Sequence, residues 1–158
     1  MTFAVIRIRS PMSKSRKIED TLNSLRLDKV NHCTILPQNK ITKGMLTRVK
    51  DVVTWGEIDE STLKSMLLDS SNLKEELTDE YLSKNTEYES MDTFVEGIIE
   101  DDTSLEDVPG LENRFRLHPP RGGFRGVKKP YRTGGSLGYR GKDINNLIGK
   151  MLDGDTDD

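Results

Sequence analysis

The most constraining feature of this 158-residue chain is the hydrophobic pattern of its first 57 residues. Residues 3–9 alternate so that Ala4, Ile6 and Ile8 point to one face and Phe3, Val5, Arg7 and Arg9 to the other, which is the period of a β-strand. One face of this strand is expected to be core and the other to end in cations, with the core face formed by Ala4, Ile6 and Ile8. Over residues 18–27 apolar residues recur at helical spacing instead, so a helix is expected to follow the strand.

Strand and helix patterns continue to alternate up to residue 57. A short apolar run over residues 32–37 indicates a second strand, a helical pattern capped by Thr42 follows it, and a third strand starts near Val52. The short connections favour a small sheet with both helices on one face. The sequence therefore predicts an α+β fold with a β-α-β-α-β core in residues 1–57.

A strongly acidic segment occupies residues 58–112. Residues 57–112 hold three lysines against eighteen acidic residues, a balance of −15 in a chain whose net charge is −3. Apolar residues recur at helical spacing in parts of this segment, so we expect short amphipathic helices with their acidic side chains outside. Because repulsion would turn such an acidic helical insertion away from nucleic acid, it should face solvent, ions or a basic partner.

The last segment, residues 113–158, begins with a basic loop. Residues 113–142 contain nine Lys and Arg, ten Pro and Gly, and no Asp or Glu. This composition excludes a long helix or regular strand and predicts an extended loop whose cations bind the phosphates of a polyanion. Aromatic rings between the cations can stack on unpaired RNA bases, and these rings belong to Phe115, Phe124 and Tyr131. A disordered basic linker is the alternative interpretation.

A helix near the carboxyl end completes the expected architecture. After the basic loop, apolar residues follow the i, i+3, i+4, i+7, i+8 pattern of a helix that starts at Asp143, and this helix should pack on the core. The three segments, residues 1–57, 58–112 and 113–158, are therefore expected to form one compact domain.

Several classes of function lack the residues that they need. Cys33 is the only cysteine and lies in an apolar run, so a buried structural thiol is expected rather than a nucleophile. With only two histidines besides, no zinc site of three or four ligands can form, and no cofactor is expected. The sequence has no run of eighteen apolar residues and no signal-peptide core, which predicts a cytoplasmic protein without membrane contact. The glycine spacings of nucleotide-binding loops are also absent.

Two parts of the sequence carry motifs typical of one family. Residues 3–57 contain an arginine at the end of the first strand, a basic loop, a Leu-x-x-Leu helix and, at the start of the second helix, Gly44-Met45-Leu46. Residues 116–152 contain the sequence Leu117-His118-Pro119-Pro120-Arg121-Gly122-Gly123. With these motifs the chain resembles the large-subunit ribosomal protein L-thirty family in its longer archaeal form, whose eukaryotic counterpart is called L-seven.

The resemblance implies a fold, a function and a set of partners. The implied fold is an antiparallel three-stranded sheet with two helices on one face, similar to a ferredoxin fold. The implied function is that of a structural protein without enzymatic activity, which binds rRNA and stabilises its fold in the large ribosomal subunit. The implied partners are the large-subunit rRNA, with 5S rRNA nearby, and neighbouring large-subunit proteins. No membrane and no small-molecule substrate is expected.

The resemblance also places an RNA-facing loop after the first strand. In this sequence the strand end and the loop comprise Arg7, Arg9, Ser10, Ser13, Lys14, Arg16 and Lys17. Cations and the N–H groups at a helix start can both bind phosphate there. Candidates on the second helix, for which solvation alone is the alternative, are Lys40, Lys43 and Arg48. Candidates in the basic loop are His118, Arg121, Gly122, Gly123, Arg125, Lys128, Lys129, Tyr131, Arg132 and Arg140.

Some features have more than one interpretation. Trp55 is either a core aromatic at the end of the third strand or a ring that stacks on a base. A small α/β sheet with an arginine after its first strand also occurs in acylphosphatase-like hydrolases, but no paired nucleophile and base stands out in this sequence. A free-standing RNA regulator or chaperone would use the same basic surface away from the ribosome.

Overall fold

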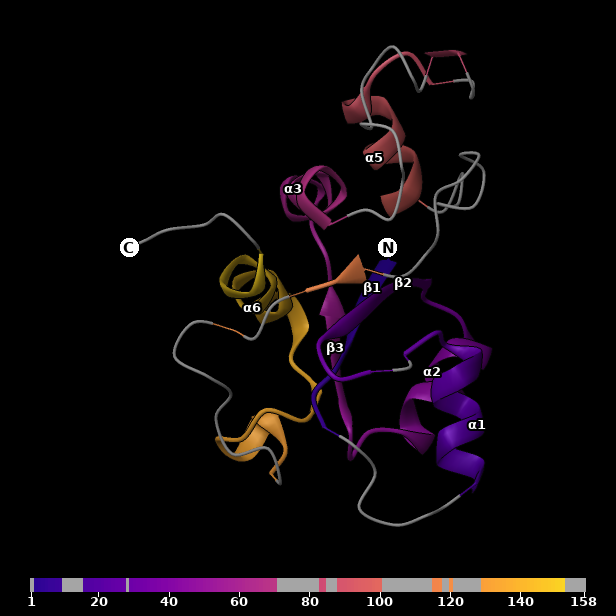
Figure 1. Ribbon diagram of the computed structural model, residues 1–158, viewed down its shortest axis with the longest axis vertical. Helices are drawn as coiled ribbons and strands as arrows, with labels where there is room; N and C mark the ends of the chain where they lie inside the picture. Colours follow the sequence, from indigo (N-terminus) through magenta and orange to yellow (C-terminus); the bar gives the residue numbers. More distant parts are fainter. Residues whose placement is uncertain are drawn as a thin grey trace.

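The computed structural model describes residues 2–9, 16–27, 29–70, 83–84, 88–100, 115–117, 120 and 129–152. These residues form an α+β fold in which helices cover both faces of a mixed five-stranded sheet (Figure 1). The predicted fold class is therefore confirmed. None of the described helices is long and apolar enough to cross a membrane.

The central strand of the sheet is β1 (Thr2–Arg7), which pairs antiparallel with β2 (His32–Pro37) and with β3 (Val53–Glu57). This arrangement confirms the antiparallel three-stranded sheet that the resemblance implies. Two-residue strands extend it at the edges, since β4 (Phe115–Arg116) pairs antiparallel with β2 and β5 (Gly138–Tyr139) pairs parallel with β3. Both edge strands lie in the basic loop, where the sequence pattern predicts no regular strand.

Two helices cover one face of the sheet, as predicted. They are α1 (Arg16–Ser24) and α2 (Lys40–Arg48), and they lie together on the same side of the strands (Figure 1). Alternate residues of β1, Phe3 and Val5, belong to a buried cluster on this side with Leu22, Leu25, Leu27, Leu46, Val49, Val52 and Val53.

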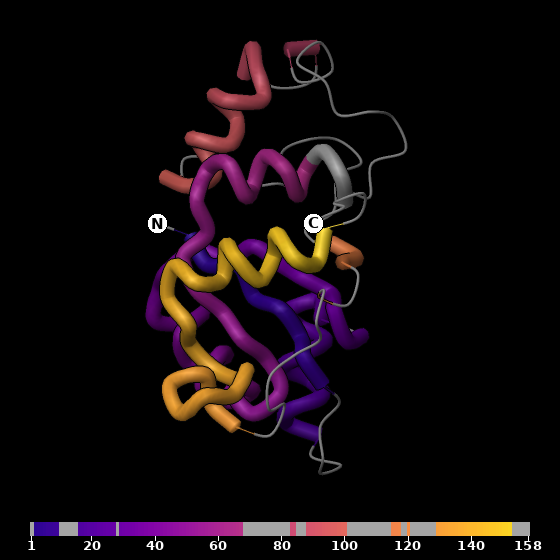
Figure 2. Tube along the Cα trace, turned by 90° about the vertical axis from the view of Figure 1, so that its left-hand side faces the viewer, coloured from indigo at the N-terminus to yellow at the C-terminus, as the bar shows by residue number. Residues whose placement is uncertain are grey.

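The other face of the sheet is covered by helices from later in the chain. They are α3 (Glu60–Ser70), α5 (Met91–Ile99) and α6 (Ile144–Met151), of which α3 and α6 run side by side (Figure 2). Ala4 and Ile6 belong to a second buried cluster on this face. Both faces of β1 are therefore core, whereas the sequence pattern assigned the core to the Ala4 face alone. The difference arises because two separate sets of helices cover the sheet.

The acidic segment contributes directly to this second cluster. Leu63 and Met66 of α3 and Phe94 of α5 are fully buried, while Asp92 and Glu96 are exposed. The predicted amphipathic helices are thus confirmed for the described part of the segment. Their apolar faces complete the core, and their acids lie outside.

Cys33 lies in the second cluster and is fully buried. Burial raises the pKa of its thiol, because a thiolate would lose its hydration there. The expected structural role of this cysteine is confirmed.

The start of α2 differs from the predicted one. Asn39 is the N-cap, and its Oδ1 accepts a hydrogen bond from the backbone N–H of Thr42 at 2.8 Å. Thr42 itself lies in the first turn of α2 and is buried. The predicted cap at Thr42 is therefore wrong.

A close backbone contact seats the carboxyl-terminal segment on β3. A Cβ atom built at Gly56 would lie 1.9 Å from the backbone oxygen of Gly141, so only glycine allows this approach. Hydrogen bonds flank the contact: Arg140 N donates to Trp55 O at 2.9 Å, and Asn145 Nδ2 donates to Glu57 O at 3.1 Å. Contacts with β3 thus hold residues 138–145 in position.

We expect the substitution Gly56→Ala to destabilise the protein by about 3 kcal/mol, because the added methyl group forces two backbones apart. The free energy of unfolding would be measured by urea denaturation followed by circular dichroism.

Gly44→Ala is the matched control. Gly44 is exposed on α2, and a Cβ there meets nothing within 4 Å, so this change should stabilise the helix by up to about 1 kcal/mol. Equal stability of the two variants would show that the contact of Gly56 with Gly141 does not hold the segment.

Candidate nucleic-acid interface

Three parts of the chain that carry candidate RNA-binding residues lie toward the same end of the molecule. The end of β1, the start of α1 and the turn Tyr131–Thr133, drawn in orange, are all at the lower end in both views, and in Figure 1 the end of β1 lies between the other two (Figures 1 and 2). The end of α2 also lies near them, since the chain runs from Arg48 directly into β3 beside the end of β1.

Arg7 and Arg9 are half-buried at this end and are held by backbone carbonyl groups. Arg7 Nη1 donates to Leu27 O at 2.9 Å, and Arg9 Nε donates to Asp51 O at 2.9 Å. These bonds tie the strand end to the chain after α1 and to the turn before β3. Both guanidinium groups therefore have fixed positions.

The start of α1 presents exposed charge. Arg16 and Lys17 are its first two residues, and both are exposed. The first N–H groups of a helix lack partners within the helix, and the helix dipole favours an anion there. The structure thus combines two cations with a helix N-terminus at the place that the resemblance indicates.

The second basic contribution comes from residues 129–142. Lys129 and Arg132 are exposed, and the turn that carries them is closed by Gly134 in the left-handed conformation at φ 95°. A positive φ costs glycine little, which suits the glycine-rich composition of this loop.

Arg140 holds this turn in place. Its Nε donates to Thr54 Oγ1 and its Nη2 donates to Ser136 O, both at 2.8 Å, and its Cζ lies 4.7 Å from the ring centroid of Tyr131. The hydroxyl of Tyr131 donates to Asp143. Burial lowers the pKa of Arg140, although a guanidinium stays charged at neutral pH. The predicted RNA-binding residues Tyr131 and Arg140 are thus engaged within the fold, where they shape the surface around Lys129 and Arg132.

The structure contradicts one candidate for RNA binding and places two others away from the rest. Phe115 is fully buried in the core, so its predicted role in stacking on RNA bases is wrong. Lys40 and Lys43 are exposed near the start of α2, away from the end where Arg48 lies.

Several candidates lie outside the described residues. They are Ser10, Ser13, Lys14, His118, Arg121, Gly122, Gly123, Phe124, Arg125 and Lys128.

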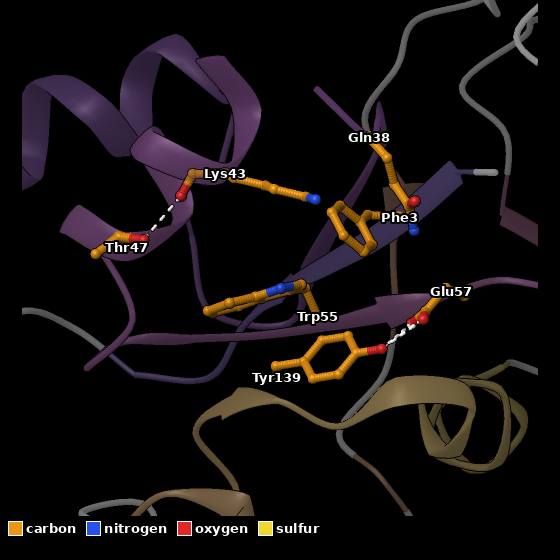
Figure 3. Close-up of a pocket in the computed structure, with 7 residues that line it drawn as sticks. All are labelled: Phe3, Gln38, Lys43, Thr47, Trp55, Glu57 and Tyr139. Carbon is orange, nitrogen blue, oxygen red and sulfur yellow. Dashed lines mark hydrogen bonds between the residues drawn. The ribbon is translucent and has the colours of Figure 1, made fainter. Parts of the chain in front are cut away.

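Sequence reasoning missed an open groove of about 380 Å³ beside α2 (Figure 3). Its wall includes Trp55, which is half-buried, and Tyr139, which is 51% exposed. The two residues are neighbours because β5 pairs in parallel with β3. A two-residue strand has no periodic signal, so the sequence could not place Tyr139 beside Trp55.

Fold and surface together define a small α+β protein with cations gathered at one end and acidic helices on one face of its sheet. The family model described as Ribosomal protein L30p/L7e matches residues 3–53. The large ribosomal subunit protein uL30 of Methanopyrus kandleri is 44% identical over 149 residues, which cover 92% of this chain and 100% of that protein.

Other archaeal relatives give the same result. The large ribosomal subunit protein uL30 of Archaeoglobus fulgidus is 44% identical over 151 residues, covering 94% of this chain and 99% of that protein. The uL30 protein of Methanosphaera stadtmanae is 41% identical over 152 residues, covering 95% and 99%. The chain therefore belongs to the ribosomal protein L30p/L7e family, as the resemblance indicated. This family is structural, which confirms that the chain is not an enzyme.

The bonds of Arg140 predict different roles for two arginines of the same loop. Arg140→Ala should lower the free energy of unfolding by roughly 1–3 kcal/mol, because two hydrogen bonds from a charged group are lost. Arg132→Ala should leave the melting temperature nearly unchanged, because Arg132 is exposed. Thermal and urea denaturation of both variants would measure this. Equal losses would mean that Arg140 is no more structural than Arg132.

Proposed function

We propose that this protein is a structural constituent of the large ribosomal subunit, where it binds the large rRNA and stabilises its fold. The observation that carries this proposal is the similarity to archaeal uL30 proteins over at least 92% of the chain. A match of that length extends into the acidic segment and the basic loop, beyond the residues 3–53 that the family model covers.

Electrostatics supplies the mechanism. The exposed cations Arg16, Lys17, Lys129 and Arg132 would neutralise phosphates and release their condensed counterions, which is the main source of affinity in such complexes. The carbonyl-bound Arg7 and Arg9 would add fixed charge beside them. No chemical step is required, because the protein acts by holding RNA segments together.

The finer placement is also part of the proposal. It puts the protein in the cytoplasm as part of the large subunit, near 5S rRNA and beside other large-subunit proteins, on the basis of the family resemblance. Residues 1–57 would supply the RNA-binding core and residues 58–112 an outward-facing acidic insertion. Within residues 113–158, the basic loop of residues 113–142 would supply a second RNA contact, and the helix after it packs on the core. The exposed acids Asp92, Glu96 and Glu100 on or next to α5 suit a position facing solvent or a basic neighbour.

Sedimentation tests the proposal. The tagged protein should co-sediment with large ribosomal subunits in a sucrose gradient and remain bound in high salt, because an integral subunit protein is enclosed by many contacts. A free-standing RNA regulator would leave the subunit fraction in high salt. Recovery of the protein only at the top of the gradient would contradict the proposal.

The start of α1 predicts a measurable salt effect. The isolated protein should bind large-subunit rRNA with a log–log salt slope of about −4, as expected for on the order of five phosphate contacts. The double change Arg16→Ala and Lys17→Ala should make the slope shallower by about 2 without altering the melting temperature.

The matched control removes the same charge elsewhere. Lys84 and Lys150 are exposed on parts of the chain outside the proposed interface, so their joint change to Ala should leave the slope nearly unchanged. Equal effects of both double variants would show that total charge, and not this surface, determines binding.

A further inference from the structure

The groove beside α2 is built from side chains of four separate elements and of one residue just after β2. Phe3 comes from β1, Lys43 and Thr47 from α2, Trp55 and Glu57 from β3, and Tyr139 from β5, with Gln38 just after β2. Figure 3 shows the Lys43 side chain extending toward Phe3, with the Trp55 ring between Lys43 and Tyr139 in that view. The groove lies at the edge of the sheet on the face that α1 and α2 cover, where these helices leave β5 open.

The aromatic rings of the groove are set for a single flat ligand. The centroids of Trp55 and Tyr139 are 6.4 Å apart and their planes meet at 49°. Phe3 and Tyr139 meet edge to face, with centroids 6.4 Å apart and an angle of 72°. Two rings at such an angle cannot sandwich a ligand between parallel faces, but one flat ring can stack on either of them. The volume of about 380 Å³ is near the lower limit for small-molecule sites and far too small for a duplex.

The polar groups of the groove are arranged unevenly. The wall formed by α2 carries one cation, Lys43, and no acidic residue. The opposite wall carries Glu57, whose carboxylate accepts a hydrogen bond from the hydroxyl of Tyr139. A carboxylate has further lone pairs, so Glu57 can still accept from a ligand. An anionic group therefore fits at the α2 wall and an N–H donor fits at Glu57.

We infer that this groove binds one unpaired base of an RNA chain. In this arrangement the base stacks on Trp55 or Tyr139, an exocyclic amino group donates to Glu57, and the phosphate of the same nucleotide meets Lys43. The inference rests on the proposed function and adds a specific base-binding subsite to it. Such a subsite would anchor a single-stranded segment at a place separate from the cations of Arg16 and Lys129.

A nucleotide explains the groove better than a protein segment does. An apolar or proline-rich peptide would use the aromatic rings but would leave Lys43 without a role. An acidic peptide would pair with Lys43 but would meet the carboxylate of Glu57 on the opposite wall. A nucleotide has a flat, polar base and an anionic phosphate, and so it matches both walls at once.

Trp55 provides a direct readout, since it is the only tryptophan of the chain. Large-subunit rRNA transcribed in vitro is titrated into the full-length protein, and tryptophan emission and affinity are measured together. Stacking should quench the emission of Trp55 by about half or more at saturation. Tyr139→Leu should weaken binding by about 10-fold, the effect of losing one base–aromatic stack.

Two variants serve as controls for this effect. Tyr139→Phe keeps the ring and loses the hydroxyl, so its affinity should stay within about 2-fold of the parent protein. Ile41→Ala removes an apolar side chain that is 76% exposed on α2 and does not line the groove, and it should change nothing. If Tyr139→Leu proves unfolded by circular dichroism, Lys43→Gln tests the same subsite from the exposed α2 wall, and it should also weaken binding.

The outcomes separate this inference from the proposed function. Salt-dependent rRNA binding with unchanged Trp55 emission and full affinity of Tyr139→Leu would overturn the subsite and leave the function intact. Equal losses in Tyr139→Phe and Tyr139→Leu would overturn the stacking role. Quenching by the protein fraction of large subunits but not by rRNA would show that a protein segment occupies the groove. If the unsubstituted protein does not bind rRNA at all, the proposed function itself is contradicted.

Discussion

The whole structure depends on the pairing of β1 along both of its edges while both of its faces are buried. Its side chains alternate between two separate clusters, with Phe3 and Val5 on one side and Ala4 and Ile6 on the other. A slip of one residue against β2 or β3 would exchange the two faces, so packing on both sides fixes the register. The register then decides which residues emerge at the end of the sheet, and it brings Arg7 level with the first residue of β3.

Local patterns sufficed to predict the β-α-β-α-β order, because each period is contained within one segment; the strand His32–Pro37 has the predicted bounds. The edge strands could not be predicted, because Phe115 and Tyr139 owe their places to partners far away in the chain, Cys33 and Trp55. For the site, the sequence indicated which residues are cationic but not where each guanidinium points. Arg140 and Arg132 belong to the same basic loop, yet only contacts with Thr54 and Ser136 distinguish them.

Seven basic residues of the proposed RNA interface therefore fall into two groups. Arg7 and Arg9 donate to backbone carbonyl groups, and Arg140 donates to the hydroxyl of Thr54, so that each joins segments that are distant in sequence. Arg16, Lys17, Lys129 and Arg132 are exposed on the surface that these bonds support. A surface that is already fixed loses less conformational entropy when it binds RNA. The hydrogen-bonded arginines would therefore raise the affinity indirectly, because they fix the surface that carries the exposed cations.

The short edge strands also affect how readily the free protein aggregates before it binds a partner. An open strand edge offers unpaired N–H and C=O groups to other chains and promotes aggregation. Along the outer edge of β3, Trp55 O accepts from Arg140 N and Glu57 O accepts from Asn145 Nδ2, so these carbonyl groups are already occupied. At the other edge β4 covers the start of β2. A glycine-rich segment that looks dedicated to a ligand thus also keeps newly made copies of the chain from adding to one another's sheets.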